Sequence, residues 1–462
     1  MLCHPLLKLF FFALFSFSLL FAQDPEQQME QDLIINLQTE NCLLPTYFSP
    51  FLSEKTELTN SYVKQLEKVL TFDLAHNGSM LFIAQTTENN QLANQSSLFD
   101  SLQQWQAQNI FFVIKGLVEQ NSLTLTVLDV KSKTVKKIGP LTLTGNLSND
   151  RRQIHRAADL IHQASFGSSG IASTKILYSV LTKNGADSTK WVSEIWEADY
   201  DGENRQQLTH ERSYSISPVY IPPKPGFVTG GFMYVSYQLS QPKIYIRSFQ
   251  EKTGHRLTTL KGNQLMPAIS LKRDQVAFIS DVVGNPDLFI LPFDPEKGAT
   301  AKPHQIFSAR KATQGSPTFS PDGKQIAFVS NKSGSPKIYL IDIPKAGASL
   351  KNIEARLISK RNRENSAPAW SPDGKKIAYC ARHGAERQIW IYDFETDQEE
   401  QLTSGPGHKE NPSWAPNSLH LIYNSSTNEE SELYFIHLKQ KKMTKLFTGK
   451  GDKRFPNWEV RF

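Results

Sequence analysis

Cysteine is scarce in this sequence. The 462 residues include 3 cysteines: Cys3, Cys42 and Cys380. Cys3 lies within the first 22 residues, and the other two are far apart in the chain. A disulfide framework needs several closely spaced cysteines, so the class of small disulfide-stapled secreted domains is excluded. Cys380 follows the apolar stretch Ile377-Ala378-Tyr379, which indicates a buried thiol rather than a reactive one.

A strong charge of one sign is also absent. Lys and Arg number 51 against 45 Asp and Glu, and the basic residues are spread along the chain instead of forming one arm. This distribution does not favour a nucleic-acid partner, and we expect none. With 39% hydrophobic and 21% charged residues, the composition is that of a globular protein with an ample core.

Long hydrophobic runs are missing after the first 22 residues. His4 and Lys8 precede the apolar run from Leu9 to Phe21, and Ala22 follows it. This run is shorter than the roughly 20 residues that a membrane-crossing helix needs. A positive start, a short apolar stretch and a small residue are typical of a secretory signal peptide. We therefore predict a signal peptide over residues 1–22, cleaved near Ala22, and an exported chain with no membrane span.

Motifs that carry enzyme chemistry are lacking as well. The chain has no Gly-x-Ser-x-Gly, because Gly167-Ser168-Ser169-Gly170 has the wrong spacing, and it has no phosphate-binding loop ending in Lys-Ser or Lys-Thr. His210-Glu211 is not followed by a histidine at the spacing required for zinc. Asp322 and Asp373 recur in equivalent Pro-Asp-Gly turns, where aspartate accepts local hydrogen bonds. We predict no catalytic residue, cofactor or metal site.

What the sequence does contain is a repeat. Five short apolar segments begin with proline, at Pro218, Pro267, Pro317, Pro368 and Pro412, with spacings of 49, 50, 51 and 44 residues. Each is followed by a turn and further short apolar segments. A period of about 40 to 50 residues with four short strands per unit is typical of a β-propeller blade.

The number of outer strands predicts six blades. Six segments resemble the fourth strand of a unit, beginning near Gln207, Arg256, Gln305, Arg356, Gln401 and Lys445. The first unit has no proline-led strand of its own, whereas Phe455-Pro456-Asn457-Trp458 at the C-terminus has no strands after it. We therefore predict that the C-terminal strand completes the first blade, because closure removes the exposed strand edges of an open array.

Ahead of the propeller, the sequence predicts an α/β domain over residues 23–166. Apolar strands are expected at 33–37, 43–48, 80–84, 110–118, 123–130 and 138–143, and helices at 61–72, around 98–105 and from 154 to Gly167. Residues 167–174 read as a linker and 175–462 as the propeller.

The chain resembles the TolB family. The resemblance rests on the order of signal peptide, α/β domain and six-bladed propeller, and on local matches at Leu44-Pro45, Trp105-Gln106-Ala107, Asp199-Tyr200-Asp201-Gly202 and Phe455-Pro456-Asn457-Trp458. It implies a non-catalytic protein of the periplasm within the Tol-Pal system, which acts during envelope constriction at division. It further implies that the propeller binds the peptidoglycan-associated lipoprotein Pal and that the N-terminal segment engages TolA. The added polar stretch 23–30 departs from the family pattern.

The partner-binding face is expected at the channel mouth, in the segments that connect the fourth strand of one blade to the proline-led strand of the next. The predicted residues are Leu265, Met266, Gly315, Ser316, Ser366, Ala367, Glu410 and Asn411. Their unlike chemistry at repeated positions favours one asymmetric protein partner. Two alternatives stay open: a propeller-containing serine peptidase, and a propeller that binds a sugar or another small ligand.

Overall fold

The computed structural model describes residues 43–95, 97–185, 189–446 and 448–461. The predicted signal peptide, the predicted strand 33–37 and Cys42 lie outside these ranges, as does Phe447. The described residues form one unit by their contacts. No helix within the described ranges has the length and apolar character that crossing a membrane requires.

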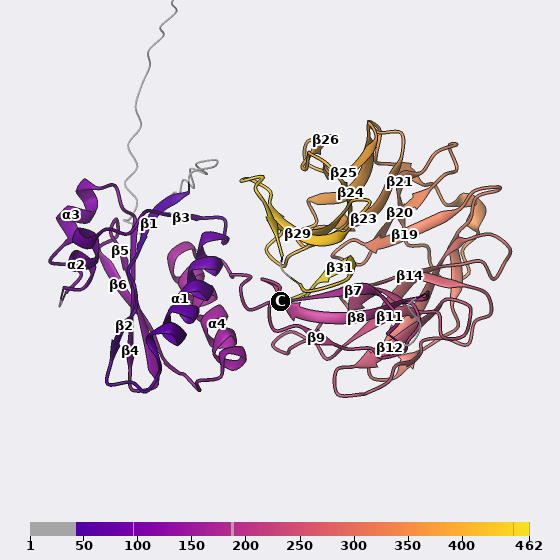
Figure 1. Cartoon of the computed structure of the whole chain (residues 1–462). Coiled ribbons are helices and arrows are strands. Elements are labelled where there is room, and N and C mark those ends of the chain that lie inside the picture. Colours follow the sequence, from indigo (N-terminus) through magenta and orange to yellow (C-terminus); the bar gives the residue numbers. More distant parts are fainter. Residues whose placement is uncertain (1–42, 96, 186–188, 447, 462) are drawn as a thin grey trace, which may run out of the picture. The chain divides into compact units, whose positions relative to one another are not determined.

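The first part of this unit is built on a mixed sheet (Figure 1), as the predicted α/β class requires. The strand order is β3-β1-β4-β5-β6, and β2 pairs with β4. Strand β1 runs parallel to β3 and β4, whereas β4, β5 and β6 are antiparallel neighbours. The bounds are β1 Leu44–Phe48, β2 Leu52–Glu54, β3 Met80–Phe82, β4 Phe112–Glu119, β5 Ser122–Asp129 and β6 Thr134–Thr142.

Within the described residues, four helices accompany this sheet: α1 (Asn60–Ala75), α2 (Thr87–Ala93), α3 (Leu102–Ala107) and α4 (Leu147–Phe166). Helix α1 starts where the Thr59 side chain accepts a hydrogen bond from the backbone N–H of Tyr62. Helix α4 ends at Gly167, whose φ of 71° is the left-handed conformation that glycine adopts without strain. The sequence analysis missed α2 and β2, which are short and carry no clear apolar period.

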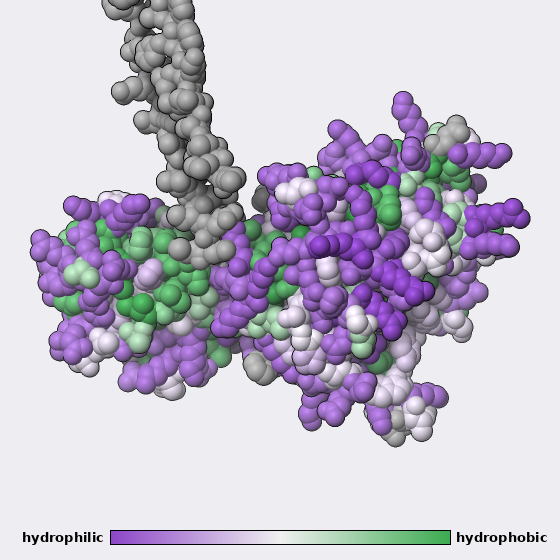
Figure 2. All heavy atoms as spheres, turned by 90° about the horizontal axis from the view of Figure 1, so that it is seen from above, coloured by the Kyte–Doolittle hydropathy of each residue, from purple (hydrophilic) through white to green (hydrophobic). Residues whose placement is uncertain are grey.

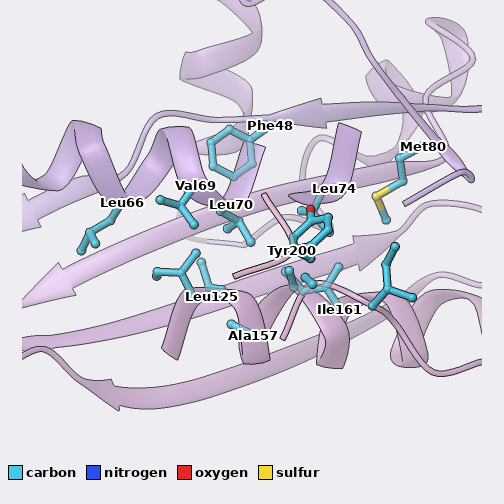
Figure 3. Close-up of a cluster of buried hydrophobic side chains, with 14 of the residues drawn as sticks. Phe48, Leu66, Val69, Leu70, Leu74, Met80, Leu125, Ala157, Ile161 and Tyr200 are labelled. Atoms are coloured by element: carbon cyan, nitrogen blue, oxygen red, sulfur yellow. The ribbon is translucent and has the colours of Figure 1, made fainter. Parts of the chain in front are cut away.

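The long helices α1 and α4 supply much of the core. Leu66, Leu70 and Leu74 on α1 are spaced four residues apart and fully buried, and Ile154 and Ile161 on α4 are buried as well. They pack in one cluster with Leu125 of β5 and with Tyr200, which belongs to the propeller (Figure 3). Apolar burial therefore runs without interruption from the α/β domain into the first blade.

The second part is a six-bladed propeller, which confirms the predicted architecture. Strands are lettered A to D in the order A-B-C-D within each blade. The blades are β31-β7-β8-β9, β10-β11-β12-β13, β14-β15-β16 with β17 and β18, β19-β20-β21-β22, β23-β24-β25-β26 and β27-β28-β29-β30.

The propeller strands are short. Strand A of the six blades is β31 (Asp452–Trp458), β10 (Ser215–Tyr220), β14 (Gln264–Ile269), β19 (Gln314–Phe319), β23 (Asn365–Trp370) and β27 (His408–Trp414). Strand B is β7 (Lys175–Lys183), β11 (Gly231–Ser236), β15 (Gln275–Ser280), β20 (Gln325–Ser330), β24 (Lys376–His383) and β28 (His420–Ser426). Strand C is β8 (Trp191–Asp199), β12 (Lys243–Ser248), β16 (Asp287–Asp294), β21 (Lys337–Asp342), β25 (Glu386–Asp393) and β29 (Ser431–His437). Strand D is β9 (Gln206–Gln207), β13 (His255–Arg256), β18 (His304–Phe307), β22 (Arg356–Leu357), β26 (Gln398–Gln401) and β30 (Met443–Lys445), and β17 (Gly298–Ala299) also pairs with β16.

The ring closes as the sequence predicts. Strand β31 at the C-terminus pairs antiparallel with β7, with Trp458 opposite Ile176 and Arg454 opposite Ser179. The indole Nε1 of Trp458 donates to Thr174 Oγ1 at 2.8 Å, and its backbone N–H donates to Ser413 Oγ at 2.9 Å. The last strand thus bonds to both the first and the sixth blade.

The antiparallel order of strands gives the propeller two distinct ends. The A–B and C–D connections lie at one end, and the D–A and B–C connections lie at the other; we call them the A–B end and the D–A end. Hydrophilic side chains cover most of the propeller face drawn in Figure 2, and hydrophobic ones reach the surface there in small groups.

Candidate functional site

Every A strand contains the same backbone irregularity. The residue before each repeated proline has a positive φ, between 42° and 55°, although none of these residues is glycine. They are Ser217, Met266, Ser316, Ala367, Asn411 and Phe455. Left-handed backbone at a residue with a Cβ costs roughly 1 to 2 kcal/mol. Six repetitions of such a conformation therefore indicate a feature that the blade geometry imposes.

This feature is a β-bulge. In the third blade, for example, Leu265 lies opposite Ile279 and Ala268 lies opposite Ala277, so Met266 and Pro267 have no partner between them. The other five A strands show the same shift of register. Proline has no N–H to donate and is tolerated in a sheet at edges and bulges. The bulge thus explains why proline recurs at this position of the inner strand.

The bulge corrects one prediction. We expected the segments before the prolines to be loops that join strand D to strand A, but strand A begins three or more residues before each proline. Leu265, Met266, Gly315, Ser316, Ser366, Ala367, Glu410 and Asn411 all lie within A strands. The chain continues as a strand past the proline because the bulge absorbs the unpaired residues.

The A strands of all six blades border a central cavity of about 870 Å³. Of the eight predicted residues, Leu265, Met266, Ser316, Ala367 and Asn411 line it. Gly315, Ser366 and Glu410 do not. Successive side chains of a strand point in opposite directions, so the side chains of Ser366 and Glu410, one position before a lining residue, turn away from the central cavity. Leu265 also precedes a lining residue but still lines the cavity. Glu410 instead forms an ion pair with Arg387 at 2.8 Å.

The cavity also has a ring of large side chains that the sequence analysis did not assign to the site. Each lies two residues after the repeated proline. They are Tyr220, Ile269, Phe319, Trp370, Trp414 and Trp458. The repeated Pro-x-aromatic pattern was visible in the sequence, but packing between blades explains it equally well. Among the described residues that line the cavity there is no histidine and no cysteine.

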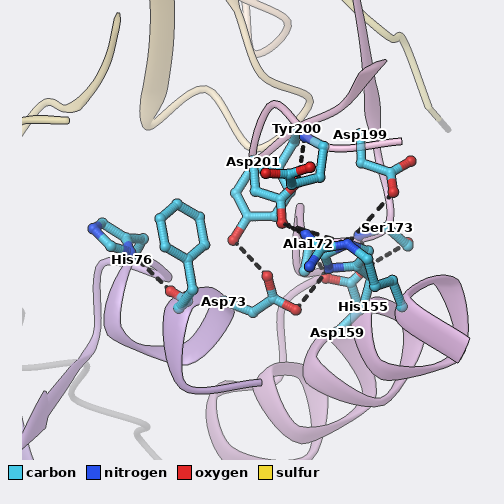
Figure 4. Close-up of polar contacts among 12 residues, drawn as sticks. Asp73, His76, His155, Asp159, Ala172, Ser173, Asp199, Tyr200 and Asp201 are labelled. Atoms are coloured by element: carbon cyan, nitrogen blue, oxygen red, sulfur yellow. Dashed lines mark hydrogen bonds and ion pairs between the residues drawn. The ribbon is translucent and has the colours of Figure 1, made fainter. Parts of the chain in front are cut away.

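A second cluster of functional groups lies at the A–B end, where the propeller meets the α/β domain (Figure 4). The Tyr200 hydroxyl donates to Asp73 Oδ1 at 2.9 Å, and Nδ1 of His155 lies 2.8 Å from Asp73 Oδ2. Nε2 of His155 is 3.7 Å from carboxylate oxygens of both Asp199 and Asp201. Asp73 lies on α1, His155 on α4, and the other three residues at the end of β8 and just beyond it.

His155 carries a proton in this setting. Burial alone would lower its pKa, but the carboxylates of Asp73, Asp199 and Asp201 outweigh burial and raise the pKa to about 10. Oxygen and nitrogen atoms of Asp73, His155 and Asp201 lie within 4.8 Å of one another, close enough to share a metal ion. The imidazolium of His155 and the guanidinium of Arg151, which pairs with Asp201, already supply positive charge there. The cluster is best described as an ionic contact between domains.

A neighbouring group of histidines is neutral. Nε2 of His420 donates to the backbone carbonyl of His76 at 2.9 Å, which joins the sixth blade to the residue after α1. Burial, together with the nearby His437, lowers the pKa of His420 to about 3. Burial likewise lowers the pKa of His437 to about 4. The two rings lie 4.7 Å apart between centroids. Sequence reasoning did not find either interdomain cluster, because its members are far apart in the chain.

Comparison with known proteins agrees with this architecture. The family model described as the TolB beta propeller domain matches residues 164–461. The protein TolB homolog of Protochlamydia amoebophila is 58% identical over 384 residues, which cover 83% of this chain and 82% of that protein. The protein TolB homolog of Chlamydia abortus is 42% identical over 328 residues, covering 70% of this chain and 74% of that protein.

A solved structure supports the fold. The crystal structure of TolB from Acinetobacter baumannii superposes with a TM-score of 0.73 at 22% identity, covering 91% of this chain and 98% of that one. The match includes the α/β domain as well as the propeller, because a propeller alone would cover far less of either chain. The closed six-bladed ring, the preceding α/β domain and the similarity along most of the sequence together show that the chain belongs to the TolB family.

Proposed function

We propose that this protein is a non-catalytic, periplasmic component of a Tol-Pal system. In this proposal it binds the peptidoglycan-associated lipoprotein Pal through its propeller and links it to TolA at the inner membrane. The link maintains envelope integrity and assists constriction at division. The proposal rests on the opening of the central cavity, or channel, at the D–A end, which we call the D–A mouth. There, unlike side chains occupy equivalent backbone positions around the ring.

The mouth suits a folded protein partner. The residues at the bulges are Ser217, Met266, Ser316, Ala367, Asn411 and Phe455, which differ in size, polarity and shape. A ligand with a repeating structure would be bound by the same type of side chain at each position. An asymmetric protein surface instead contacts a different side chain at each position. The ionic and histidine contacts with the α/β domain lie at the opposite A–B end. The D–A mouth is therefore on the side away from those contacts.

Binding at the mouth can be tested by calorimetry against the soluble domain of the Pal-like lipoprotein from the same organism. Ser316→Arg and Ala367→Glu should each weaken binding roughly tenfold, because a bulky charge would be buried in the interface. Stability should change little, since both residues lie outside the packed core. Ser349→Arg and Ala301→Glu make the same changes at exposed positions of the A–B end and serve as controls. Wild-type affinity in both mouth variants would show that the lipoprotein does not bind at the mouth.

The periplasmic location rests on the predicted signal peptide. Intact-mass analysis of the purified protein should place the mature N-terminus near Gln23, and the protein should fractionate with periplasmic contents. A mass that retains residues 1–22, together with membrane association that resists carbonate, would contradict this. The same preparation tests the proposed contact with TolA: deletion of residues 23–30 should reduce TolA binding in a pull-down without affecting lipoprotein binding.

A small-ligand propeller is the second candidate. Its support is the volume of the cavity, about 870 Å³, which falls within the range of roughly 300 to 1,000 Å³ typical of small-molecule pockets. Aromatic side chains such as Trp370 and Trp414 line it and could stack on a sugar ring. Titration with soluble peptidoglycan fragments distinguishes the two candidates. Saturable binding of a fragment, combined with no binding of the lipoprotein domain, would favour this second function.

A further inference from the structure

An exposed apolar patch lies on one side of the D–A mouth, over the second and third blades. We call it the apolar crescent and define it by Tyr214, Tyr237, Leu239, Leu265, Met266 and Val283. The exposed fraction is 42% for Tyr214, 54% for Leu239, 42% for Met266 and 58% for Val283. Such fractions are high for large apolar side chains that a partner does not cover.

Part of the crescent lines the channel. The rings of Tyr214 and Tyr237 contact each other with centroids 6.3 Å apart. Tyr237, Leu265 and Met266 line the central cavity, and Leu239 lies in the B–C turn two residues after Tyr237. Met266 reaches the fourth blade, where its sulfur is 3.0 Å from the backbone N of Ser316. One partner could thus cover the crescent and enter the channel at the same time.

Positive charge lies at the same end of the propeller as the crescent. We call this set the basic rim and define it by exposed residues in four consecutive D–A connections: Arg212, Lys261, Arg310, Lys311 and Arg363. Among the described residues, none of these five side chains has a carboxylate within 4.0 Å. None of the five therefore forms an ion pair within the part of the chain that the structure describes.

The carboxylates nearby already accept hydrogen bonds or form ion pairs. Glu211 accepts hydrogen bonds from the hydroxyls of Tyr234 and Ser236, both at 2.5 Å. Asp281 accepts from the side chain of Asn263 at 2.6 Å. On the far side of the mouth, at the fifth and sixth blades, Arg387 pairs with Glu410 at 2.8 Å. The mouth is therefore asymmetric in its apolar surface, which lies over the second and third blades. Exposed cations without a described carboxylate within 4.0 Å occur on both sides, because Lys450 and Arg454 lie where the sixth blade meets the first.

We propose that the partner docks off-centre, on the side of the second and third blades. It inserts an apolar side chain over the apolar crescent and presents carboxylates to the basic rim. This inference rests on the proposed function, because it takes the partner to be an acidic face of the lipoprotein's soluble domain. Exposed aromatic and aliphatic anchors supply most of the affinity of an interface, and surrounding charges steer association and select the partner.

The chemistry favours a protein over a polyanion such as nucleic acid or an anionic lipid headgroup. Cationic side chains alone are enough to bind nucleic acid or an anionic headgroup, and the affinity of such binding comes almost entirely from charge. Here four large apolar side chains that are 42% to 58% exposed lie at the same end of the propeller as the cations. Covering this apolar surface releases free energy only if the partner brings apolar surface of its own.

The test uses the full-length mature protein and the lipoprotein's soluble domain in calorimetry. Leu239→Asp should weaken binding roughly tenfold or more, as truncation of an interface anchor does. Phe227→Asp is its matched control, because Phe227 is 71% exposed but lies in the A–B connection of the same blade, at the other end. Lys261→Glu should weaken binding severalfold and reduce its dependence on NaCl concentration. Lys302→Glu, an exposed lysine in a C–D connection, should change neither.

The outcomes separate this inference from the proposed function. If the wild type binds and Leu239→Asp and Lys261→Glu bind equally well, the off-centre site is wrong while the proposed function stands. If the wild type does not bind the lipoprotein domain, both are overturned. Binding of anionic vesicles or of a DNA oligonucleotide that Lys261→Glu abolishes and Leu239→Asp leaves unchanged would replace the protein partner with a polyanion.

Discussion

The hydroxyl of Tyr200, in the first blade of the propeller, donates a 2.9 Å hydrogen bond to Oδ1 of Asp73 in helix α1 of the α/β domain. Both side chains are almost fully buried, with exposed fractions of 1% and 2%. Burial and the carboxylate of Asp73 raise the pKa of Tyr200 far above that of free tyrosine, so the hydroxyl keeps its proton and acts as a donor. The contact ties the two domains together through groups that water cannot reach.

Tyr200→Phe should destabilise the protein by about 1 to 3 kcal/mol, because a buried carboxylate oxygen loses its hydrogen-bond donor. Tyr423→Phe is the control. Tyr423 is also fully buried, but its hydroxyl has no hydrogen-bond partner within the described part of the chain, so its removal should be neutral or slightly stabilising. Urea unfolding followed by tryptophan fluorescence measures both. Equal changes in the two variants would mean that the Tyr200 hydroxyl does not hold the domains together.

The interdomain histidines predict a pH optimum for stability. The native pKa values of His420 and His437 are about 3 and about 4, below the ordinary value of 6.5. As pH falls below 6.5, these histidines take up protons in the unfolded chain but not in the native one. The free energy of unfolding therefore decreases. His155 acts in the opposite sense: its native pKa of about 10 lies above 6.5, so its contribution is complete below pH 6.5 and is lost as pH rises toward 10.

The acid side of this profile can be assigned to a residue. Each depressed histidine should contribute a slope of up to about 1.4 kcal/mol per pH unit below its unfolded pKa. His437→Gln removes one titrating group, so its free energy of unfolding should fall less steeply between pH 6.5 and pH 5 than that of the wild type. His383→Gln, an exposed histidine in the fifth blade, is the control. Parallel profiles for the wild type and His437→Gln would contradict the assignment.

The repeat was readable from the sequence because it has a local cause. Proline restricts φ and lacks an N–H, so the bulged inner strand of each blade selects it, and Pro218 to Pro412 reveal the period. The turns were readable for the same reason: the backbone N–H of Lys324 donates to Asp322 Oδ1 at 3.0 Å, and Gly323 has a φ of 72°. Blade number followed from counting the six segments that resemble a fourth strand, and ring closure followed from the first unit's missing proline-led strand and the unpaired one at the C-terminus.

The bulges and the interdomain clusters could not be predicted in this way. Left-handed φ usually marks glycine or asparagine, but here Met266, Ala367 and Phe455 adopt it. The register of the neighbouring strand imposes this conformation, so no residue type signals it. Asp73 and His155 are 82 residues apart and meet only when α1 packs on α4. Such contacts depend on tertiary packing, which single-sequence patterns do not encode.

Ala367 offers a direct test of the strain at the bulges. Its φ is 47°, so Ala367→Gly removes a Cβ that the left-handed conformation disfavours. Part of this gain is offset because glycine makes the unfolded chain more flexible. We expect a net stabilisation of about 0.5 to 1 kcal/mol. Ala369→Gly, two residues later in the same strand and without positive φ, should instead destabilise by about 1 kcal/mol. Destabilisation in both variants would mean that the bulge carries no strain.

The closing strand provides the last prediction. Trp458 in β31 is 1% exposed, and β31 is the only strand paired with β7 on its inner side within the described residues. Trp458→Ala should cost about 3 to 5 kcal/mol, because a large buried side chain leaves a cavity. Deletion of residues 456–462 should cost more, since it also exposes the inner edge of β7 and removes the bond between Trp458 N–H and Ser413. Exposed Trp191, in the same blade, gives the control Trp191→Ala, for which little change is expected. Thermal unfolding measures all three. A truncated protein that melts at the wild-type temperature would show that the ring is stable without its C-terminal strand, and that the pairing of β31 with β7 contributes nothing to the propeller's stability.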